Sequence, residues 1–274
     1  MCSAFKLLAL CLALAGSSVA YASSPDLWVC ADRKSLPYSN ERGEGFENKL
    51  AQMVAKDLSR TLQYVWWPPS QTFARKLFLR GACDVIMGVP SKAYDLAEPT
   101  HPYYTSSFVF VTRRDRNLRI SSFDDPALRT VRIGLPVVDD GATPAAHELA
   151  QRGLTRSVVG YNPFGDLSKE NQPAELVKAV AKGDIDVAVA WGPLAGYFTQ
   201  QSSVPLKLTP ICTSARLGSL PQVFSISIGV RHGEEDLLAQ LNAELARRRT
   251  QIRSLLLSYG VPLLQQDSST RLCK

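Results

Sequence analysis

The sequence contains little of what metal and redox sites require. It has only three histidines, His101, His147 and His232, and no two of them stand at the spacing of paired metal ligands. None of its six cysteines belongs to a Cys-x-x-Cys pair, which argues against a zinc ribbon or a dithiol redox site. The glycine-rich loops of nucleotide-binding proteins and the serine turn of α/β-hydrolases are also absent. The chain therefore offers no common catalytic motif, and we expect a protein that is not an enzyme.

Long apolar runs are absent as well. Only the N-terminus is markedly apolar, and its run at 7–15 is shorter than the roughly 20 residues that cross a bilayer. Lys6 precedes this run, and Ala20-x-Ala22 matches the small-residue pattern of a signal peptidase site. We therefore expect residues 1–22 to be a signal peptide cleaved after Ala22, a periplasmic mature chain and no membrane span.

The charge balance is mildly basic, with 31 Lys and Arg against 25 Asp and Glu. A nucleic-acid-binding protein would gather its basic residues with stacking aromatics on one face, and no such pattern is present. We therefore expect no nucleic acid as partner. Arginines gather at 113–119 and at 247–253. Solvated surface is the simpler interpretation of both clusters, and the second is a candidate surface for docking on an acidic protein.

Four cysteines remain after the signal peptide: Cys30, Cys83, Cys212 and Cys273. An exported protein is expected to use them in disulfides, and four cysteines allow three connectivities. Cys30 ends one apolar strand and Cys83 begins another. If these strands are neighbours in a parallel sheet, the pairs are 30–83 and 212–273.

Strand and helix patterns alternate along the chain, which predicts parallel strand pairing in an α/β fold. The predicted strands are 27–31, 62–66, 84–89, 107–112, 131–135, 157–160, 185–190 and 223–230. The predicted helices begin near Phe46, Phe73, Pro144 and Pro173, and a single C-terminal helix is expected at 237–257. Two crossings, near 109–114 and 224–230, are expected to form a hinge. We predict that 23–112 and 224–274 form lobe I and that 113–223 form lobe II.

Short motifs that carry a family resemblance stand in order along the mature chain. They are Val29–Asp32, Leu36–Asn40, Gly43–Asn48, Trp66–Pro68, Cys83–Pro90, Pro102–Tyr104, Asp139–Gly141, Thr143–His147, Gly183–Asp186 and Ala190–Tyr197. Through them the chain resembles the extracellular solute-binding family (family 3 type) that includes periplasmic amino-acid receptors. Within that family it is most similar to the J proteins encoded with methanol dehydrogenases (MxaJ/XoxJ type).

This resemblance implies a fold and a role. The fold is the bilobed periplasmic-binding-protein fold (type II), with two α/β lobes joined by a two-strand hinge. The role is that of an accessory protein without a cofactor of its own. It assists the assembly or activation of a methanol (alcohol) dehydrogenase that uses pyrroloquinoline quinone, and that enzyme is the expected partner.

The same resemblance implies a changed ligand. Receptors for α-amino acids typically clamp the ligand carboxylate with an arginine a few residues after the third strand, because a guanidinium matches a planar anion. Here the corresponding turn, Val89–Tyr94, contains no arginine. Those receptors also hold the α-ammonium with an aspartate, where this chain has Trp191-Gly192-Pro193. We therefore do not expect an ordinary amino acid in the cleft.

Aromatic residues dominate what remains for a ligand. They suit a flat or apolar molecule, or a side chain inserted by a partner protein. For Trp66 and Tyr104, core and hinge packing is the simpler interpretation. For Thr143, an ordinary helix N-cap is simpler than an anion site. The predicted cleft residues are Tyr38, Trp67, Pro90, Ser91, Tyr103, Thr143 and Trp191.

Two other functions stay open. The chain is a transporter receptor for a small solute other than an amino acid if the cleft closes on a metabolite. It is a periplasmic dehydratase-like enzyme if a cleft carboxylate has a strongly raised pKa. The candidate carboxylates for the second alternative are Asp32, Glu44 and Asp139.

Overall fold

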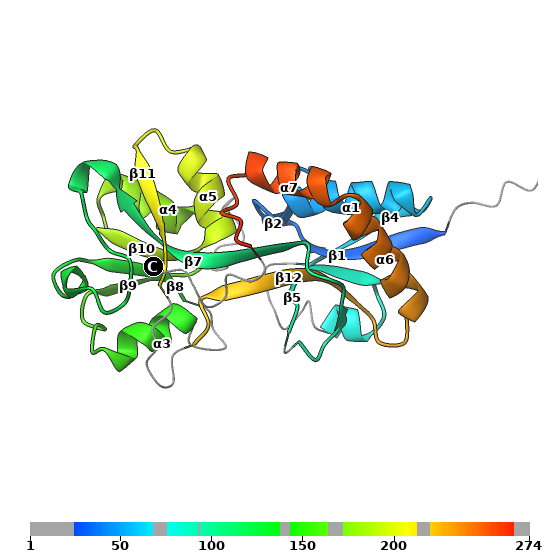
Figure 1. Cartoon of the computed structure of the whole chain (residues 1–274), viewed down its shortest axis with the longest axis horizontal. Coiled ribbons are helices and arrows are strands. Elements are labelled where there is room, and N and C mark those ends of the chain that lie inside the picture. Colours follow the sequence, from blue (N-terminus) through cyan, green and yellow to red (C-terminus); the bar gives the residue numbers. More distant parts are fainter. Residues whose placement is uncertain are drawn as a thin grey trace, which may run out of the picture.

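The computed structural model describes residues 25–67, 76–92, 94–137, 143–163, 172–212 and 220–265. Two α/β halves lie side by side, and long strands run between them (Figure 1). The expected cleavage site after Ala22 lies outside the described residues, as does the start of the helix expected near Phe73.

Lobe I is built on parallel strands covered by helices. Its strands are β1 (Asp26–Asp32), β4 (Thr61–Trp67) and β5 (Val85–Pro90), and its helices are α1 (Phe46–Asp57), α6 (Glu235–Arg247) and α7 (Arg249–Ser258). Short strands β2 (Lys34–Ser35), β3 (Ser39–Asn40) and β6 (Glu98–Pro99) lie in its loops. Leu50 and Val54 of α1 are buried at helical spacing in one core with Leu241 and Ile252 of the C-terminal helices.

Lobe II repeats this pattern on the other side of the molecule. Its strands are β8 (Ile133–Pro136), β9 (Val158–Tyr161), β10 (Val187–Trp191) and β11 (Leu206–Pro210), and its helices are α3 (Pro144–Gln151), α4 (Ala174–Lys182) and α5 (Gly192–Gln200). Short 3₁₀ turns occupy Arg114–Arg116 and Pro126–Arg129. Gly183, with φ of 81°, ends α4 in the left-handed conformation.

One continuous strand order joins the two lobes: β4-β1-β5-β12-β7-β10-β8-β9. β12 (Val223–Val230) and β7 (Tyr104–Arg113) are its central members. The first part of β7 pairs with β12 up to Ser107, and from Phe108 onward β7 pairs with β10, with β11 joining from Val109. The lobe boundaries at residues 112 and 224 stay a prediction. Strand β7 exchanges its partner β12 for β10 between Ser107 and Phe108.

The segment after α7 makes a further connection between the lobes. Ser106 of β7 donates a hydrogen bond to the carbonyl oxygen of Pro262 at 2.7 Å, and the amide of Leu264 donates to the carbonyl of Thr105 at 2.9 Å. Gly196 of α5 lies so near Gly260 that an added Cβ would stand 1.9 Å from the Gly260 carbonyl oxygen. The residues after α7 therefore pack directly on a lobe II helix.

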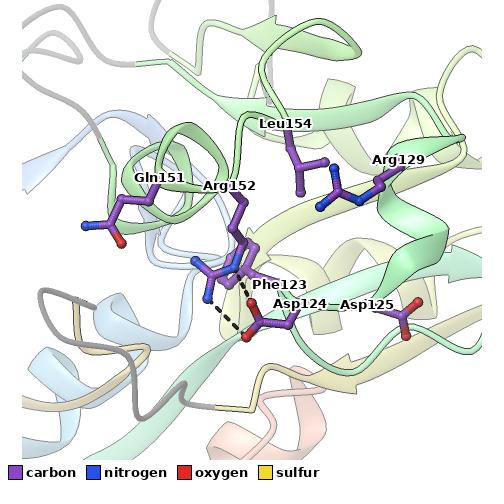
Figure 2. Close-up of a pocket in the computed structure, with 7 residues that line it drawn as sticks. All are labelled: Phe123, Asp124, Asp125, Arg129, Gln151, Arg152 and Leu154. Atoms are coloured by element: carbon purple, nitrogen blue, oxygen red, sulfur yellow. Dashed lines mark hydrogen bonds and ion pairs between the residues drawn. The ribbon is translucent and has the colours of Figure 1, made fainter.

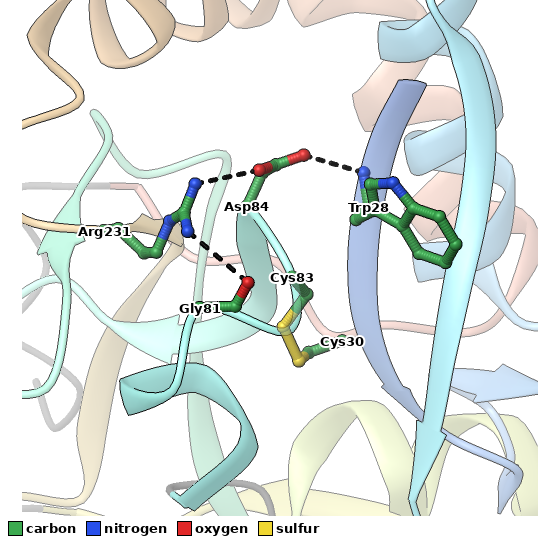
Figure 3. The surroundings of a disulfide bond; sticks show 6 residues. All are labelled: Trp28, Cys30, Gly81, Cys83, Asp84 and Arg231. Carbon is green, nitrogen blue, oxygen red and sulfur yellow. Dashed lines mark hydrogen bonds and ion pairs between the residues drawn. A yellow bond between two sulfur atoms is a disulfide. The ribbon is translucent and has the colours of Figure 1, made fainter. Parts of the chain in front are cut away.

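The disulfide between Cys30 and Cys83 fastens the N-terminal end of β5 to β1 (Figure 3). The two strands are parallel neighbours, as the pairing expectation required, and the two Cα atoms are 5.5 Å apart. Beside the bridge, Asp84 accepts from the Trp28 amide at 2.9 Å and from Arg231 at 3.0 Å. The 30–83 pair is confirmed. Cys212 is also disulfide-bonded, but its expected partner Cys273 lies outside the described residues, so that pair stays a prediction.

One expectation about a helix was wrong, and one helix was not predicted. The single helix expected at 237–257 is two helices, because Arg248 adopts φ −93° and ψ 5° between α6 and α7. Its guanidinium is turned to Asp57 of α1, with an Nε–Oδ2 distance of 2.8 Å. Helix α5 was not among the predicted helices, and it begins with Gly192-Pro193. Proline fits there because it stands in the first turn, where no intrahelical donor is needed.

Candidate functional site

The candidate site lies where the carboxyl ends of β1 and β5 meet the first turn of α1. Strand β1 lies between β4 and β5 in the sheet. The connection after β1 therefore leads to one side of this strand, and the connection after β4 leads to the other side. In open α/β sheets such a switch point is where ligands bind. The loop before α1 is held in place because the amides of Phe46 and Glu47 donate to the carbonyls of Pro37 and Tyr38 at 2.8 and 2.9 Å.

Glu47 is the buried charge of this site. Only 8% of its surface is exposed. The hydroxyl of Tyr103 donates to its Oε1 at 3.3 Å, and no other described side chain donates to the carboxylate. Gly88 of β5, with φ of 74°, faces the same oxygen, and an added Cβ would lie 2.5 Å from it. Glycine at residue 88 therefore makes room for the carboxylate of Glu47.

The surroundings of Glu47 change its protonation. Burial raises its pKa from 4.5 to about 7, and the hydrogen bond from Tyr103 offsets only part of that rise. Burial also raises the pKa of Tyr38, Tyr103 and Tyr104, and the charge of Glu47 adds to each rise. The site therefore holds one carboxyl group that is close to half protonated at neutral pH, among tyrosines that stay neutral.

Aromatic rings continue from Glu47 toward lobe II. Tyr38 and Tyr104 each meet Phe46 edge to face, with centroids 5.5 and 6.1 Å apart, and Tyr103 meets Tyr104 at 5.0 Å. Trp191 packs on the core cluster that contains Tyr104, which places Trp191 next in the series. The site is thus continuous across the lobe junction.

At the junction three rings from three strands form a cluster. Trp191 of β10 lies 5.3 Å from Phe108 of β7 and 5.9 Å from Phe224 of β12, and Phe108 and Phe224 are 6.3 Å apart. All three side chains are half-buried. This cluster sits where β7 changes partners, so any movement of the lobes alters its packing.

The end of β5 supplies polar groups that are already engaged. Pro90 pairs with Ile226 of β12, and the Ser91 amide donates to the Ser225 carbonyl at 2.9 Å. The hydroxyls of Ser91 and Ser227 are 2.6 Å apart, and Ser227 donates to the Thr100 carbonyl at 2.8 Å. Since the proton of Ser227 is used there, Ser91 donates to Ser227. Ser91 is left with acceptor capacity only.

The other predicted cleft residues are less informative. Thr143 accepts a hydrogen bond from the Ala146 amide at 3.2 Å, which is an ordinary N-cap of α3. The side chain of Trp67 lies outside the described residues, although its backbone ends β4. Trp66 stacks on Tyr64 with centroids 4.5 Å apart.

Two of the three carboxylates proposed for catalysis fall within the described chain. Glu44 is exposed, and hydrogen bonds from Asn40 and Arg42 lower its pKa. Burial raises the pKa of Asp32, at the end of β1, and the hydrogen bond from the Lys34 amide offsets only part of that rise. Asp139 lies outside the described residues. Glu44 therefore lacks the raised pKa that the enzyme alternative needs.

A separate pocket of about 240 Å³ lies on lobe II (Figure 2). Arg152, whose side chain is 4% exposed, binds Asp124 at 2.9 Å and Glu148 at 2.6 Å and lies over the ring of Phe123. The two carboxylates engage its guanidinium. This pocket contains none of the predicted site residues, and we interpret it as a structural ion-pair network.

Metal and membrane features were also considered over the described ranges. No group of three or more His, Cys, Asp or Glu there is arranged to hold a metal ion. No helix in the same ranges has the length and apolarity to cross a membrane.

Curated relatives identify the family. Protein MoxJ of Methylorubrum extorquens is 32% identical over 268 residues, which cover 91% of this chain and 86% of the relative. Protein MoxJ of Paracoccus denitrificans is 30% identical over 92% of this chain and 94% of the relative. The chain belongs to the MoxJ family. No protein-family model matches it.

Solved structures agree with membership of the MoxJ family. The periplasmic binding protein XoxJ from Methylobacterium extorquens shares 34% identity and a TM-score of 0.71, covering 88% of this chain and all of that one. MxaJ from Methlophaga aminisulfidivorans shares 32% identity and a TM-score of 0.75, covering 87% of this chain and all of that one. An ancestral cationic amino-acid binding protein at 20% identity, with a TM-score of 0.66, shares the fold. The expected bilobed periplasmic-binding-protein fold is confirmed.

The structure of this MoxJ family member groups some predicted residues and separates others. Tyr38, Tyr103 and Trp191 pack on one core cluster beside Glu47. Thr143 caps its own helix on lobe II. Glu47 had no distinguishing signal in the sequence, because an acidic residue in the first turn of a helix is common. Only the approach of β5 and Tyr103 buries it.

Proposed function

We propose that this chain is a periplasmic binding protein that serves as an accessory to a methanol (alcohol) dehydrogenase using pyrroloquinoline quinone, assisting its assembly or activation. The observation that carries the proposal is membership in the MoxJ family over 91% of the chain. The resemblance to the J proteins encoded with methanol dehydrogenases supplies the partner. A structural relative, XoxJ, is named as a periplasmic binding protein.

The chemistry of the site supports a guest other than an amino acid. Ser91 follows β5 where an arginine would be needed to clamp a carboxylate, and its hydroxyl is bound to Ser227. Trp191 stands at the end of β10 where an aspartate would hold an ammonium, and it packs against two phenylalanine rings. Half-buried rings favour a flat or apolar molecule, or an aromatic or aliphatic side chain from the partner.

A deletion strain tests the proposal. We expect loss of the protein to lower dehydrogenase activity in the periplasm, and the wild-type chain to restore it. Trp191→Ala is expected to restore it poorly, because the substitution removes the ring at the centre of the junction cluster. Trp28→Ala is the matched control, since Trp28 is 40% exposed on the outer part of β1. Full dehydrogenase activity in the deletion strain contradicts the proposal.

A second candidate, a periplasmic dehydratase-like enzyme, is favoured by one observation. Glu47 is a buried carboxyl group whose pKa is raised to about 7, the range that suits a general acid or base at neutral pH. If the chain is such an enzyme, Glu47→Gln abolishes turnover of its substrate. Under the accessory proposal, Glu47→Gln still supports dehydrogenase activity in the deletion strain.

The third candidate is a transporter receptor for a small solute. It requires that lobe closure be driven by a periplasmic metabolite. A thermal-shift screen of such solutes distinguishes it: a hit that raises the unfolding temperature and depends on Trp191 favours the receptor.

A further inference from the structure

A groove of about 420 Å³ lies between α1 and the end of α7. The two helices run side by side on the same face of lobe I (Figure 1). Four residues of α1 and two from the C-terminal region line the groove: Lys49, Gln52, Met53, Lys56, Leu255 and Tyr259. None of these residues takes part in the site described above.

The floor of the groove is apolar, and its tyrosine, Tyr259, is held in place by several contacts. Met53, Leu255 and Tyr259 are half-buried, so part of each side chain stays accessible. The hydroxyl of Tyr259 donates to the Glu44 carbonyl, and its ring meets Phe46 at 5.8 Å. The Tyr259 ring also stacks on Tyr197 of α5, with centroids 5.7 Å apart. A surface already held in this way costs little ordering entropy when a partner binds.

The rim of the groove is positively charged. Lys49 and Lys56 are exposed and stand seven residues apart on α1, which is about 10.5 Å along the helix axis. Neither forms an ion pair with any described residue. No aspartate or glutamate lines the groove.

Two acids beside the rim, Asp57 and Glu44, are engaged elsewhere. Asp57 follows Lys56, but Arg248 and Arg247 bind its carboxylate and hold its pKa at about 2. Glu44 is within electrostatic range of Lys49, but its carboxylate accepts from Asn40 at 2.6 Å and from Arg42 at 2.9 Å. The two lysines therefore keep most of their positive field for a partner.

We propose that this groove docks an acidic partner protein, through a segment that places an apolar side chain on the floor between two carboxylates about two helical turns apart. A second copy of this chain does not fit, because a two-fold contact would bring lysine rims together on chains whose net charge is +6 each. The basic rim and the apolar floor select this chemistry independently of the dehydrogenase of the proposed function.

Site-specific photo-crosslinking in cells of the source organism tests this inference. A benzophenone amino acid replaces Met53 in the full chain, and crosslinked products are identified and mapped by mass spectrometry. The positional control carries the same group at Val159 of lobe II, which is 39% exposed. The charge-reversal variant is Lys49→Glu with Lys56→Glu. Its control, Lys182→Glu with Lys207→Glu, makes the same change of net charge at exposed lysines of lobe II.

The expected product joins residue 53 to a segment that carries carboxylates on both sides of an apolar residue. Reversal at 49 and 56 is expected to lower its yield about tenfold, since rim charges act mainly on the association rate. Reversal at 182 and 207 is expected to leave the yield within about twofold. Thermal unfolding of each variant confirms that it is folded.

Several results overturn the inference: no product at residue 53 above the Val159 control, a product with a second copy of the chain, a mapped segment without acidic residues, or equal loss in both reversal variants. Capture of the dehydrogenase supports both the groove and the proposed function. Capture of a different acidic protein by the expected segment supports the groove and counts against the dehydrogenase as the docked partner.

Discussion

Replacing Glu47 by glutamine is expected to stabilise the protein relative to the wild type, and this difference is expected to be larger above neutral pH than in acid. Glu47 is 8% exposed and meets one side-chain donor, Tyr103, at 3.3 Å. A charge in that position lacks the hydrogen bonds and the counter-ion that normally offset burial. Glutamine has the same shape, carries no charge and still accepts from Tyr103.

The magnitude follows from the pKa of Glu47. Burial raises it from 4.5 to about 7. Each pKa unit is 1.36 kcal/mol, so the full effect is about 3 kcal/mol. Because the folded protein holds the proton more tightly than the unfolded chain, this contribution is complete below pH 4.5 and is lost as the pH rises through about 7. Glu47→Gln lacks this dependence.

Urea unfolding followed by far-UV circular dichroism, at several pH values from about 4 to about 8, checks this prediction. The unfolding free energy of Glu47→Gln minus that of the wild type should rise by about 3 kcal/mol across the range. Glu44→Gln is the matched control, because the pKa of exposed Glu44 is lowered and gives no rise of this sign. A difference that stays flat, or falls with rising pH, refutes the account of Glu47.

Three further predictions concern the fold. Replacing both Cys30 and Cys83 by alanine opens a link across 53 residues and should lower the unfolding free energy by about 4 kcal/mol, measured in urea with and without reductant. Gly196→Ala should cost about 2 kcal/mol, because the methyl group collides with the Gly260 backbone, and a variant as stable as the wild type would contradict that contact. Asp57→Asn should lower stability at neutral pH. The wild type should lose stability as the pH falls from 3.8 through about 2, and Asp57→Asn should not show this loss. Urea midpoints at low and neutral pH measure both effects.

Much of the fold follows from local patterns. The apolar spacing from Phe46 predicted α1, and Pro173 predicted where α4 begins. The break at Arg248 was not predictable from spacing, because Ile252 and Leu256 continue the apolar pattern of the preceding turns. At this break the guanidinium of Arg248 binds Asp57, which is 191 residues away in the sequence.

The candidate site was predictable only in part. Tyr38, Tyr103 and Trp191 stand beside prolines or glycines at the ends of strands, a position that places side chains at the edge of a sheet. Glu47 looks in the sequence like any acidic residue at the start of a helix. Its raised pKa comes from burial in the folded chain, where Gly88 of β5 lies against its carboxylate, while the hydrogen bond from Tyr103 acts in the opposite direction.

The arginine run at 247–253 illustrates the same limit. Arg247 and Arg248 are engaged with Asp57, so they are not the free charges that the sequence suggested. Arg249 and Arg253 are exposed and form no ion pair with the described residues. The basic rim at Lys49 and Lys56 is the stronger docking candidate, because it flanks an apolar floor.

Co-purification from the periplasm tests the central claim most directly. A tagged chain is isolated from cells growing by alcohol oxidation, and the recovered dehydrogenase is assayed for activity and for bound quinone and metal. The account predicts that the dehydrogenase is recovered with the tagged chain, and that without the chain the dehydrogenase pool contains less quinone or metal and is less active. If the dehydrogenase is never recovered and is fully loaded and active in the deletion strain, the account is contradicted.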